Sequence, residues 1–415
     1  MSSKKKTTHS NKEGKPGRVP KLRFPEFRAT EGWENTTLGD VTTKTDKRNK
    51  GGKSYPVYSI SNKTGFTPQS EQFEGVDSET RGYDIAVYKL IESNTFAYNP
   101  ARINVGSIGY SGELNDVIIS SLYVCFKSNG AATDEFLLHF FGTSDFAKSV
   151  NNHVEGGIRS YLFYENFARI GIALPSLREQ QKVAECLSSV DDVIAAQARK
   201  VDALKTHKKG LMQQLFPGEG ETQPRLRFPE FRRDQQWDAT PLGKVAENLD
   251  NKRVPITSSE RKAGDVPYYG ASGIVDYVEG FIFNEDLLCV SEDGANLVAR
   301  TSPIAFSIAG KTWVNNHAHV LRFEDDCTRK FVEVYLNSIK LDDFITGMAQ
   351  PKLNKAMLDR IPIPQPKLPE QQRIADCLSS VDALIAAEAQ KLEALNRHKR
   401  GLMQQLFPTS AEVEP

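Results

Sequence analysis

The chain has 415 residues, 39% of them hydrophobic and 26% charged, so it is long enough and apolar enough to bury more than one core. Its 53 basic and 53 acidic residues cancel, and this balance neither indicates nor excludes a nucleic-acid partner, because local patches decide that question. Apolar runs of about 18 residues are absent, and the five Cys show no CxxC spacing. These features predict a cytoplasmic protein without a membrane span or a disulfide framework.

A basic tail over residues 1–20, which we expect to be disordered, precedes the heptapeptide LRFPEFR at Leu22–Arg28. The same heptapeptide recurs at Leu226–Arg232, and a Trp follows each copy at the same interval, at Trp33 and Trp237. The sequence therefore predicts a tandem repeat with a period of about 200 residues, which is far longer than the periods of solenoid proteins.

The first head follows the first heptapeptide, within residues 21–175, and has a mixed α/β pattern. We predict a strand at Asp84–Tyr88 and a helix at Thr133–Val150. Basic side chains gather in Gly-rich loops, where they can neutralise phosphates while polar neighbours read base edges. An ordinary solvated loop is the alternative. The candidate DNA-contacting residues of this head are Lys47, Arg48, Lys50, Lys53, Tyr58, Asn62, Arg102, Arg159 and Ser160.

A long helix is predicted over residues 176–217. Its apolar residues are spaced alternately by three and four, which is a heptad seam, with polar interruptions at Gln197 and Lys208. A rod of about 38 residues would be about 57 Å long, and one apolar stripe on such a rod needs a partner. The predicted pairing residues are Leu187, Val190, Ile194, Val201 and Leu204.

The second head, within residues 218–366, resembles the first only at its flanks. We predict a strand at Leu287–Val290 and a helix at Thr328–Thr346. His317 and His319 are separated by one residue, which favours alternation along a strand over a metal site. The candidate DNA-contacting residues are Tyr269, Ser272, Asn296, Arg300, Lys311, Lys352, Asn354 and Lys355.

A second long helix is predicted over residues 367–408, ahead of a short tail at 409–415. Its stretch Leu368–Pro408 is identical to Leu177–Pro217 at 28 of 41 positions. We expect the two helices to pair as an antiparallel coiled coil related by a pseudo-twofold, although each helix could instead pack on its own head. The pairing residues of this helix are Leu378, Val381, Ile385, Leu392 and Leu395.

No motif for catalysis is recognisable in the sequence. A nucleotide-binding P-loop would need Gly where Ala305 stands, and Asn99–Arg102 lacks the second Pro and the aromatic residue of an adenine methyltransferase loop. No Ser-His-Asp set or metal-carboxylate set is present. We therefore expect no catalytic residues, no metal and no directly bound cofactor.

The repeated EQQ helix that ends in GLMQQLFP resembles the specificity subunit of type I restriction–modification systems. Several loops resemble its target-recognition domains, among them Tyr268–Gly273, Ser291–Asn296, Trp313–His317, Gly156–Arg159 and Pro351–Asn354. The resemblance implies an α+β fold with two mixed α/β target-recognition domains, at 21–175 and 218–366, separated by two long antiparallel helices.

The resemblance also implies a function without catalysis. Each head would read one half of a bipartite, asymmetric site in double-stranded DNA, while the helices set the spacing and dock two methyltransferase subunits. Motor–nuclease subunits would join the complex. S-adenosylmethionine, ATP and Mg would then be bound by the partner subunits. Two other classes remain open: a coiled-coil adaptor that binds protein partners, and a nuclease or methyltransferase with unrecognised motifs.

Overall fold

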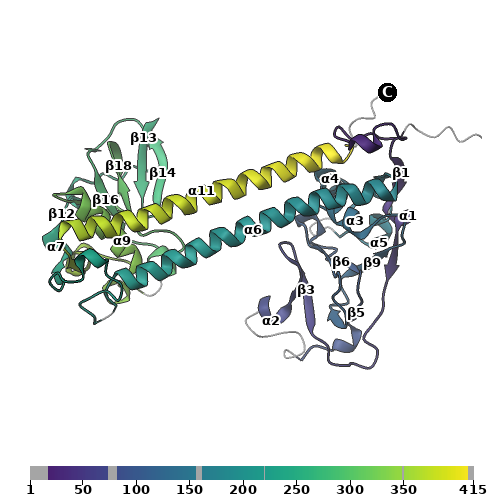
Figure 1. Cartoon of the computed structure of the whole chain (residues 1–415), viewed down its shortest axis with the longest axis horizontal. Coiled ribbons are helices and arrows are strands. Elements are labelled where there is room, and N and C mark those ends of the chain that lie inside the picture. Colours follow the sequence, from purple (N-terminus) through teal and green to yellow (C-terminus); the bar gives the residue numbers. More distant parts are fainter. Residues whose placement is uncertain (1–16, 73–81, 156–160, 219, 348–349, 410–415) are drawn as a thin grey trace, which may run out of the picture. The chain divides into compact units, whose positions relative to one another are not determined.

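The computed structural model describes residues 17–72, 82–155, 161–218, 220–347 and 350–409. The chain divides into two compact units, one of residues 1–196 with 392–415 and the other of residues 197–391. Each unit thus holds one head, the first half of one long helix and the second half of the other (Figure 1). No helix in the described part of the chain has both the length and the apolarity needed to cross a membrane.

Unit 1 contains three sheets, with strand orders β2-β9-β6-β7, β4-β3-β8-β5 and β1-β10. All pairs are antiparallel except β3 and β8, which run parallel. The strands are β1 (Glu34–Thr37), β2 (Thr42–Thr45), β3 (Val57–Ser61), β4 (Gly65–Pro68), β5 (Lys89–Ile91), β6 (Phe96–Tyr98), β7 (Ile108–Tyr110), β8 (Val117–Ile119), β9 (Val124–Ser128) and β10 (Gly171–Leu174).

Short helices connect these strands. Two predictions made for the secondary structure of this head are wrong. The predicted helix Thr133–Val150 is two helices, because the hydroxyl of Thr143 caps a new helix by accepting from the backbone N–H of Phe146 at 3.2 Å. The predicted strand Asp84–Tyr88 is a 3-10 turn capped by Asp84, and the strand begins only at Lys89. The helices are α1 (Leu38–Val41), α2 (Gln69–Gln72), α3 (Asp134–Phe141), α4 (Ser144–His153) and α5 (Tyr164–Phe167), with 3-10 turns η1 (Pro25–Phe27), η2 (Ile85–Val87) and η3 (Ile103–Val105).

An aromatic cluster fills the core of unit 1, and the last turn of the second long helix belongs to it. Phe407 packs edge-on against Trp33, with ring centroids 6.1 Å apart, and lies 5.2 Å from Phe136. Its neighbours Met403 and Leu406 are buried in the same cluster as Leu187 of the first long helix. The core of the first head is therefore closed by a segment from the end of the chain.

Unit 2 repeats this plan with strand orders β12-β19-β16-β17, β14-β13-β18-β15 and β11-β20. Strand β16 contains the predicted strand Leu287–Val290, which is confirmed. The strands are β11 (Asp238–Pro241), β12 (Glu247–Asn248), β13 (Ala263–Gly270), β14 (Gly273–Val278), β15 (Phe283–Asn284), β16 (Leu287–Ser291), β17 (Ala305–Ile308), β18 (Lys311–Val314), β19 (Ala318–Arg322) and β20 (Pro362–Gln365).

The main helix of the second head is shorter than predicted. The expected helix Thr328–Thr346 is α9 (Asp326–Ser338), which begins two residues earlier because Asp325 caps it, and a separate 3-10 turn follows at Asp342–Phe344. The remaining helices are α7 (Leu242–Val245), α8 (Asn296–Ala299) and α10 (Lys355–Arg360), with 3-10 turns η4 (Pro229–Phe231), η5 (Asp250–Lys252) and η6 (Asp342–Phe344).

The two heads share one topology although their sequences diverge. Each has a two-stranded sheet at its base and two four-stranded sheets connected in the same order, and each places its single parallel pair at the same point, β3 with β8 and β13 with β18. The predicted α+β tandem repeat is thus confirmed, and the divergence of the two sequences leaves the connection order of the sheets unchanged.

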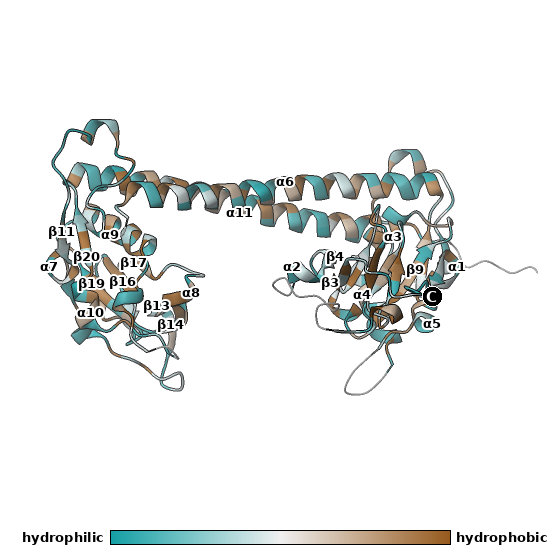
Figure 2. Ribbon diagram, turned by 90° about the horizontal axis from the view of Figure 1, so that it is seen from below, coloured by the Kyte–Doolittle hydropathy of each residue, from teal (hydrophilic) through white to brown (hydrophobic). Residues whose placement is uncertain are grey.

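The two long helices, α6 (Leu177–Leu215) and α11 (Leu368–Leu406), each have 39 residues and run antiparallel within each unit (Figures 1 and 2). In unit 2 the ammonium of Lys208 lies 2.6 Å from Asp382, and that of Lys200 lies 2.5 Å from Glu388. Residue numbers along α11 therefore fall as those along α6 rise, as in an antiparallel pair. The polar interruption at Gln197 is buried and donates to the carboxylate of Glu388 at 2.6 Å.

The predicted seam follows the less exposed stripe of both helices. Leu187, Val201 and Leu378 are buried, and the other seven predicted pairing residues are partly buried. Leu187 and Leu378 also belong to the cores of the heads that precede them. The two arrangements weighed from the sequence therefore coexist, because each helix packs on its own head at its start and on the other helix further along.

Candidate nucleic-acid interface

A buried ion pair fixes each head to the start of its long helix, and it explains the repeated motifs. In unit 1, Glu179 of α6 accepts from Nε and Nη2 of Arg23, both at 2.8 Å, and from the indole N–H of Trp33 at 3.1 Å. The Arg23 and Glu179 side chains are only 6% and 2% exposed. The hydrogen bond that Arg23 donates to Glu179 raises the pKa of Arg23 despite its burial, so the guanidinium stays charged.

Unit 2 contains the same arrangement at the repeated positions. Glu370 of α11 accepts from Arg227 at 2.7 and 2.8 Å and from Trp237 at 3.1 Å. The Arg of LRFPEFR, the following Trp and the Glu of EQQ thus form one clamp. In the sequence these three residues belong to separate repeated motifs. Their role is structural, and the reading face must be sought in the segments where the heads differ.

Two of the candidate DNA-contacting residues in the first head already have acidic partners. The ammonium of Lys47 lies 2.5 Å from Glu92, and the guanidinium of Arg48 lies 3.1 Å from Asp46, so part of the basic loop is neutralised within the head. The hydrogen bond from Lys47 lowers the pKa of Glu92 more than any other contact of that carboxylate. Lys53 stacks over the ring of Tyr55 at 4.8 Å.

The remaining candidates of the first head differ in exposure. Lys50, Asn62 and Arg102 are exposed and have no side-chain partner among the described residues, so they can reach a ligand outside the protein. Tyr58 is partly buried in β3, where it pairs with Ile119. The predicted contacts Arg159 and Ser160 lie outside the described residues.

In the second head, two candidates serve the structure of their own loop. Arg300, in a left-handed conformation with φ of 51°, donates to the carbonyls of Leu297, Leu336 and Ile339, and burial lowers its pKa. The amide of Asn296 bonds to Ser302 through both its nitrogen and its oxygen. We therefore do not include Arg300 and Asn296 in the proposed DNA face, although their charge and polarity made them candidates.

The other candidates lie on or near exposed loops. Lys352 is half exposed and lies 3.2 Å from Glu292, and Lys311 stacks over Phe281 at 5.0 Å. Asn354 caps α10, where its side chain accepts from the N–H of Met357 at 3.0 Å. Tyr269 stacks on Phe306, whereas Ser272 and Lys355 are exposed. Burial raises the pKa of Tyr269, which therefore keeps its hydroxyl proton.

A hollow in the second head gathers several loops that the sequence singled out. It is lined by Tyr268, Gly270 and Ala271 at the end of β13, by Arg261 in the loop before that strand, and by Asn315, Asn316 and His317. Asn316 and His317 are exposed there, while Asn315 is buried and accepts from the N–H of His317 at 2.8 Å. Amide and guanidinium groups on a concave face are the groups that read base edges in grooves. The sequence analysis placed Asn316 in the loop Trp313–His317 but not among the candidate contacts, because one Asn among many carries no distinguishing signal.

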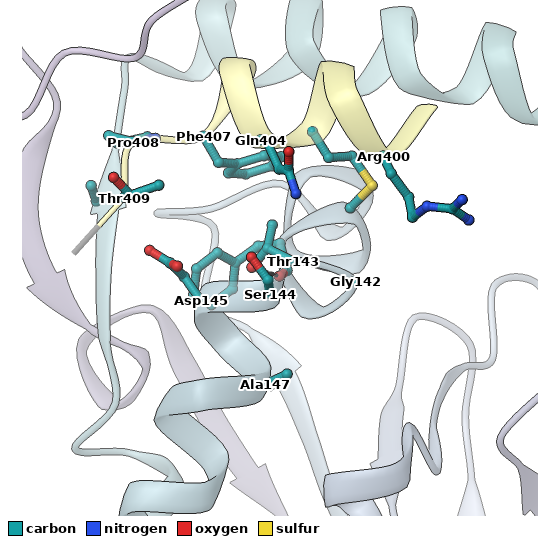
Figure 3. A pocket seen from close by; sticks show the side chains of 13 residues that line it. Gly142, Thr143, Ser144, Asp145, Ala147, Arg400, Gln404, Phe407, Pro408 and Thr409 are labelled. Atoms are coloured by element: carbon teal, nitrogen blue, oxygen red, sulfur yellow. Dashed lines mark hydrogen bonds between the residues drawn. The ribbon is translucent and has the colours of Figure 1, made fainter. Parts of the chain in front are cut away.

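Unit 1 also contains an apolar pocket of about 270 Å3 between the α3–α4 turn and the end of α11. Figure 3 shows Phe407 facing the turn at Thr143, while Arg400 points away from Asp145. The apolar lining includes Phe140, Met403 and Phe407, which also belong to the core cluster. The pocket is therefore part of the packing between α11 and the first head.

Two heads with one topology and different loops, each clamped to a nearly identical helix, define a tandem recognition protein. Exposed cationic and amide side chains, among them Lys50, Asn62, Lys355 and Asn316, lie on the divergent segments of both heads. The chain belongs to the family of type I restriction modification DNA specificity domains, whose model matches residues 30–206 and 234–397. It is thus a DNA specificity subunit of a type I restriction–modification system, a family without catalytic function of its own.

Relatives in sequence agree with this assignment, and a solved structure shares the fold. A Haemophilus influenzae protein named as a type I restriction enzyme specificity subunit is 39% identical over 144 residues, which are 35% of this chain and 37% of that protein. The MjaX specificity subunit of Methanocaldococcus jannaschii is 24% identical over 410 residues, 92% of this chain and 95% of that one. The fold resembles the crystal structure of the S subunit from M. genitalium, with a TM-score of 0.58 at 13% identity, covering 95% of this chain and all of that one.

Proposed function

We propose that each head reads one half of a bipartite, asymmetric DNA site, and that the two long helices set the spacing between the halves. The observation that carries this proposal is the contrast between frame and loops. The sheets, clamps and helices are repeated, whereas the loops that would face DNA differ between the heads. Two different half-sites require two different reading surfaces on a common frame.

Phosphate contacts would orient each head, and base contacts would give the sequence preference. In the first head, the exposed and unpaired Lys50 and Arg102 suit phosphates, and Asn62 suits a base edge. In the second head, Lys355 suits a phosphate and Asn316 suits a base edge, because an Asn amide can bond an adenine at two positions. Tyr269, Ser272, Lys311 and Lys352 complete the proposed face of the second head.

The helices would have two roles in this proposal. Their facing stripes would hold them together through Leu187, Val190, Ile194, Val201, Leu204, Leu378, Val381, Ile385, Leu392 and Leu395. Their outward faces, alike in both copies, would dock two methyltransferase subunits of one kind, and motor–nuclease subunits would join. S-adenosylmethionine, ATP and Mg would be bound by those partners.

A footprint on DNA tests the two-half reading. The full chain, assembled with its methyltransferase subunits, should protect two short specified segments separated by a spacer of any sequence. Protection of one continuous segment would contradict it, and so would binding without preference for any sequence.

Removing one heptad from each helix tests the spacing role. Deleting 198–204 from α6 together with the facing 385–391 of α11 keeps the seam in phase and shortens the rod by about 10 Å. At about 3.4 Å per base pair, the spacer should shorten by about three base pairs. An unchanged spacer would remove the helices from this role.

A further inference from the structure

A buried network of charges joins four segments of the second head. It contains Asp250 and Arg253 near η5, Glu292 after β16, His319 in β19 and Lys352 in the loop before α10. Arg253 donates to Glu292 at 2.7 Å and lies 3.4 Å from Asp250, while Lys352 lies 3.2 Å from the other oxygen of Glu292. The His319 and Arg253 side chains are only 1% and 12% exposed.

The two ring nitrogens of His319 both face acceptors. Nδ1 lies 2.6 Å from the carboxylate of Asp250, and Nε2 lies 2.7 Å from the carbonyl oxygen of Leu353. A carbonyl oxygen can only accept, so Nε2 must carry a proton. Burial opposes ionisation of Asp250, but the bonds from His319 and the Val320 N–H, with the charge of Arg253, outweigh it and lower its pKa. Asp250 therefore accepts as well, and the geometry is fully satisfied only by an imidazolium.

The cluster is not arranged to hold a metal ion. Potential ligand atoms of Asp250, Glu292 and His319 lie within 4.8 Å of one another. Hydrogen-bond donors already occupy them, because Arg253, Lys352 and His319 bring three positive charges to two carboxylates. The pKa of Glu292 is lowered by Arg253, His319 and Lys352 against the opposing effect of burial. The neighbouring thiol of Cys289 stays neutral, because burial raises its pKa.

The network connects the strand that carries His319 to two loops with proposed DNA contacts. Through Leu353 it fixes the loop that carries Lys352, and the N–H of Leu353 returns a bond to the carbonyl of Glu292 at 2.8 Å. Glu292 in turn donates from its N–H to the carbonyl of His317, next to the exposed Asn316, at 2.9 Å. A shift of His319 would therefore move both loops.

The first head keeps the acidic position but uses a different cation. The two units align with an offset of 204 residues, which matches Asp250 to Asp46 as it matches Leu226 to Leu22 and Trp237 to Trp33. The registers of β2–β9 and β12–β19 then place Val124 where His319 stands. Asp46 instead lies 2.9 Å from the ammonium of Lys89, whose side chain is 8% exposed.

We propose that His319, as an imidazolium held between Asp250 and the carbonyl of Leu353, is a positioning residue for base reading by the second head. Lys89 has the corresponding role toward Asp46 in the first head. This inference rests on the proposed function, since it assigns a residue to the accuracy of one half-site. It predicts that loss of His319 lowers the accuracy of reading at the second half-site and leaves the first half-site unchanged.

The test uses the full chain with its methyltransferase subunits and four duplexes: the split site that the complex methylates, the same duplex with either half scrambled, and the duplex with both halves scrambled. His319→Gln should lower discrimination at the second half about tenfold or more, the order of one lost base-pair contact, and leave the first half unchanged. Lys89→Met, the matched control, should do the reverse. Affinity for a fully scrambled duplex and its salt dependence should stay constant, because the phosphate contacts remain.

Affinity for the fully scrambled duplex separates positioning from a general structural role, because a misfolded head would lose its phosphate contacts as well. Equal loss of discrimination at both halves, or a loss of affinity for the scrambled duplex that matches the loss of discrimination, would overturn the proposal. If His319→Gln fails to fold, Asp250→Asn should lower discrimination at the second half alone, and unchanged discrimination would overturn the proposal. A wild-type complex that ignores scrambling of either half refutes the proposed function itself.

Discussion

The clamp at the start of α6 gives the sharpest stability prediction. Glu179→Ala removes an acceptor that holds both Arg23 and Trp33, and it leaves a guanidinium nearly buried without its counter-charge. The remaining bonds from Nη1 and Nη2 of Arg23 to the carbonyls of Thr30 and Glu31 leave its Nε–H without an acceptor and its charge without a counter-charge. Breaking one side of a buried ion pair costs about 3–5 kcal/mol.

That loss should fall on unit 1, which consists of residues 1–196 and 392–415, or about 220 residues. For a unit of this size, each kcal/mol lowers the melting temperature by about 2–4 °C, so the expected drop is about 6–20 °C. Calorimetry of the full chain measures it, with Glu370→Ala as the matched variant in unit 2. Glu185→Ala, on the exposed face of α6, should change stability by less than about 0.5 kcal/mol.

The double variant Arg23→Met with Glu179→Leu provides a further check. Removing both charges leaves no uncompensated ion, so the double variant should be more stable than Glu179→Ala alone. The reasoning is refuted if Glu179→Ala costs less than about 1 kcal/mol, or if it lowers the transitions of both units equally.

Three further outcomes are expected. Phe407→Ala should destabilise unit 1, and Phe216→Ala unit 2, by about 3–5 kcal/mol each in urea unfolding, and an effect confined to the other unit would contradict the packing described here. Because the folded pKa of Asp250 lies below its ordinary value of 3.8, its contribution to stability is present above that pH and is lost as the pH falls through the folded pKa. Acid unfolding should therefore be less steep for Asp250→Asn than for wild type. Lys50→Ala and Arg102→Ala should each weaken binding to scrambled DNA and reduce the salt slope by about 1 without lowering the melting temperature, and a matching loss of stability would make the residue structural.

The long helices could be predicted from the sequence because their signal is local. Heptad spacing and terminal Pro residues give the length to within a few residues, and the predicted interruption at Gln197 is a buried polar contact to Glu388. The break at Thr143 is also a local signal, since a Thr after Gly142 is a good helix cap, but the apolar pattern across it favoured one helix.

The shared topology of the heads could not be predicted, because it depends on pairings between strands far apart in sequence, such as β3 with β8. Two of the candidate contacts were misplaced on the DNA face for a related reason. Charge and polarity mark Arg300 and Asn296 as candidates, but only the fold shows that their donors are used by nearby carbonyls. Asp250 and His319 lie 69 residues apart, and no local pattern joins them.

A map of methylated bases across a genome, made with this chain and its methyltransferase subunits as the only such enzyme present, tests the central claim most directly. The account predicts one asymmetric sequence with two specified segments and an unspecified spacer of fixed length. Methylation at a continuous or palindromic site, or at sites without a common sequence, would contradict it.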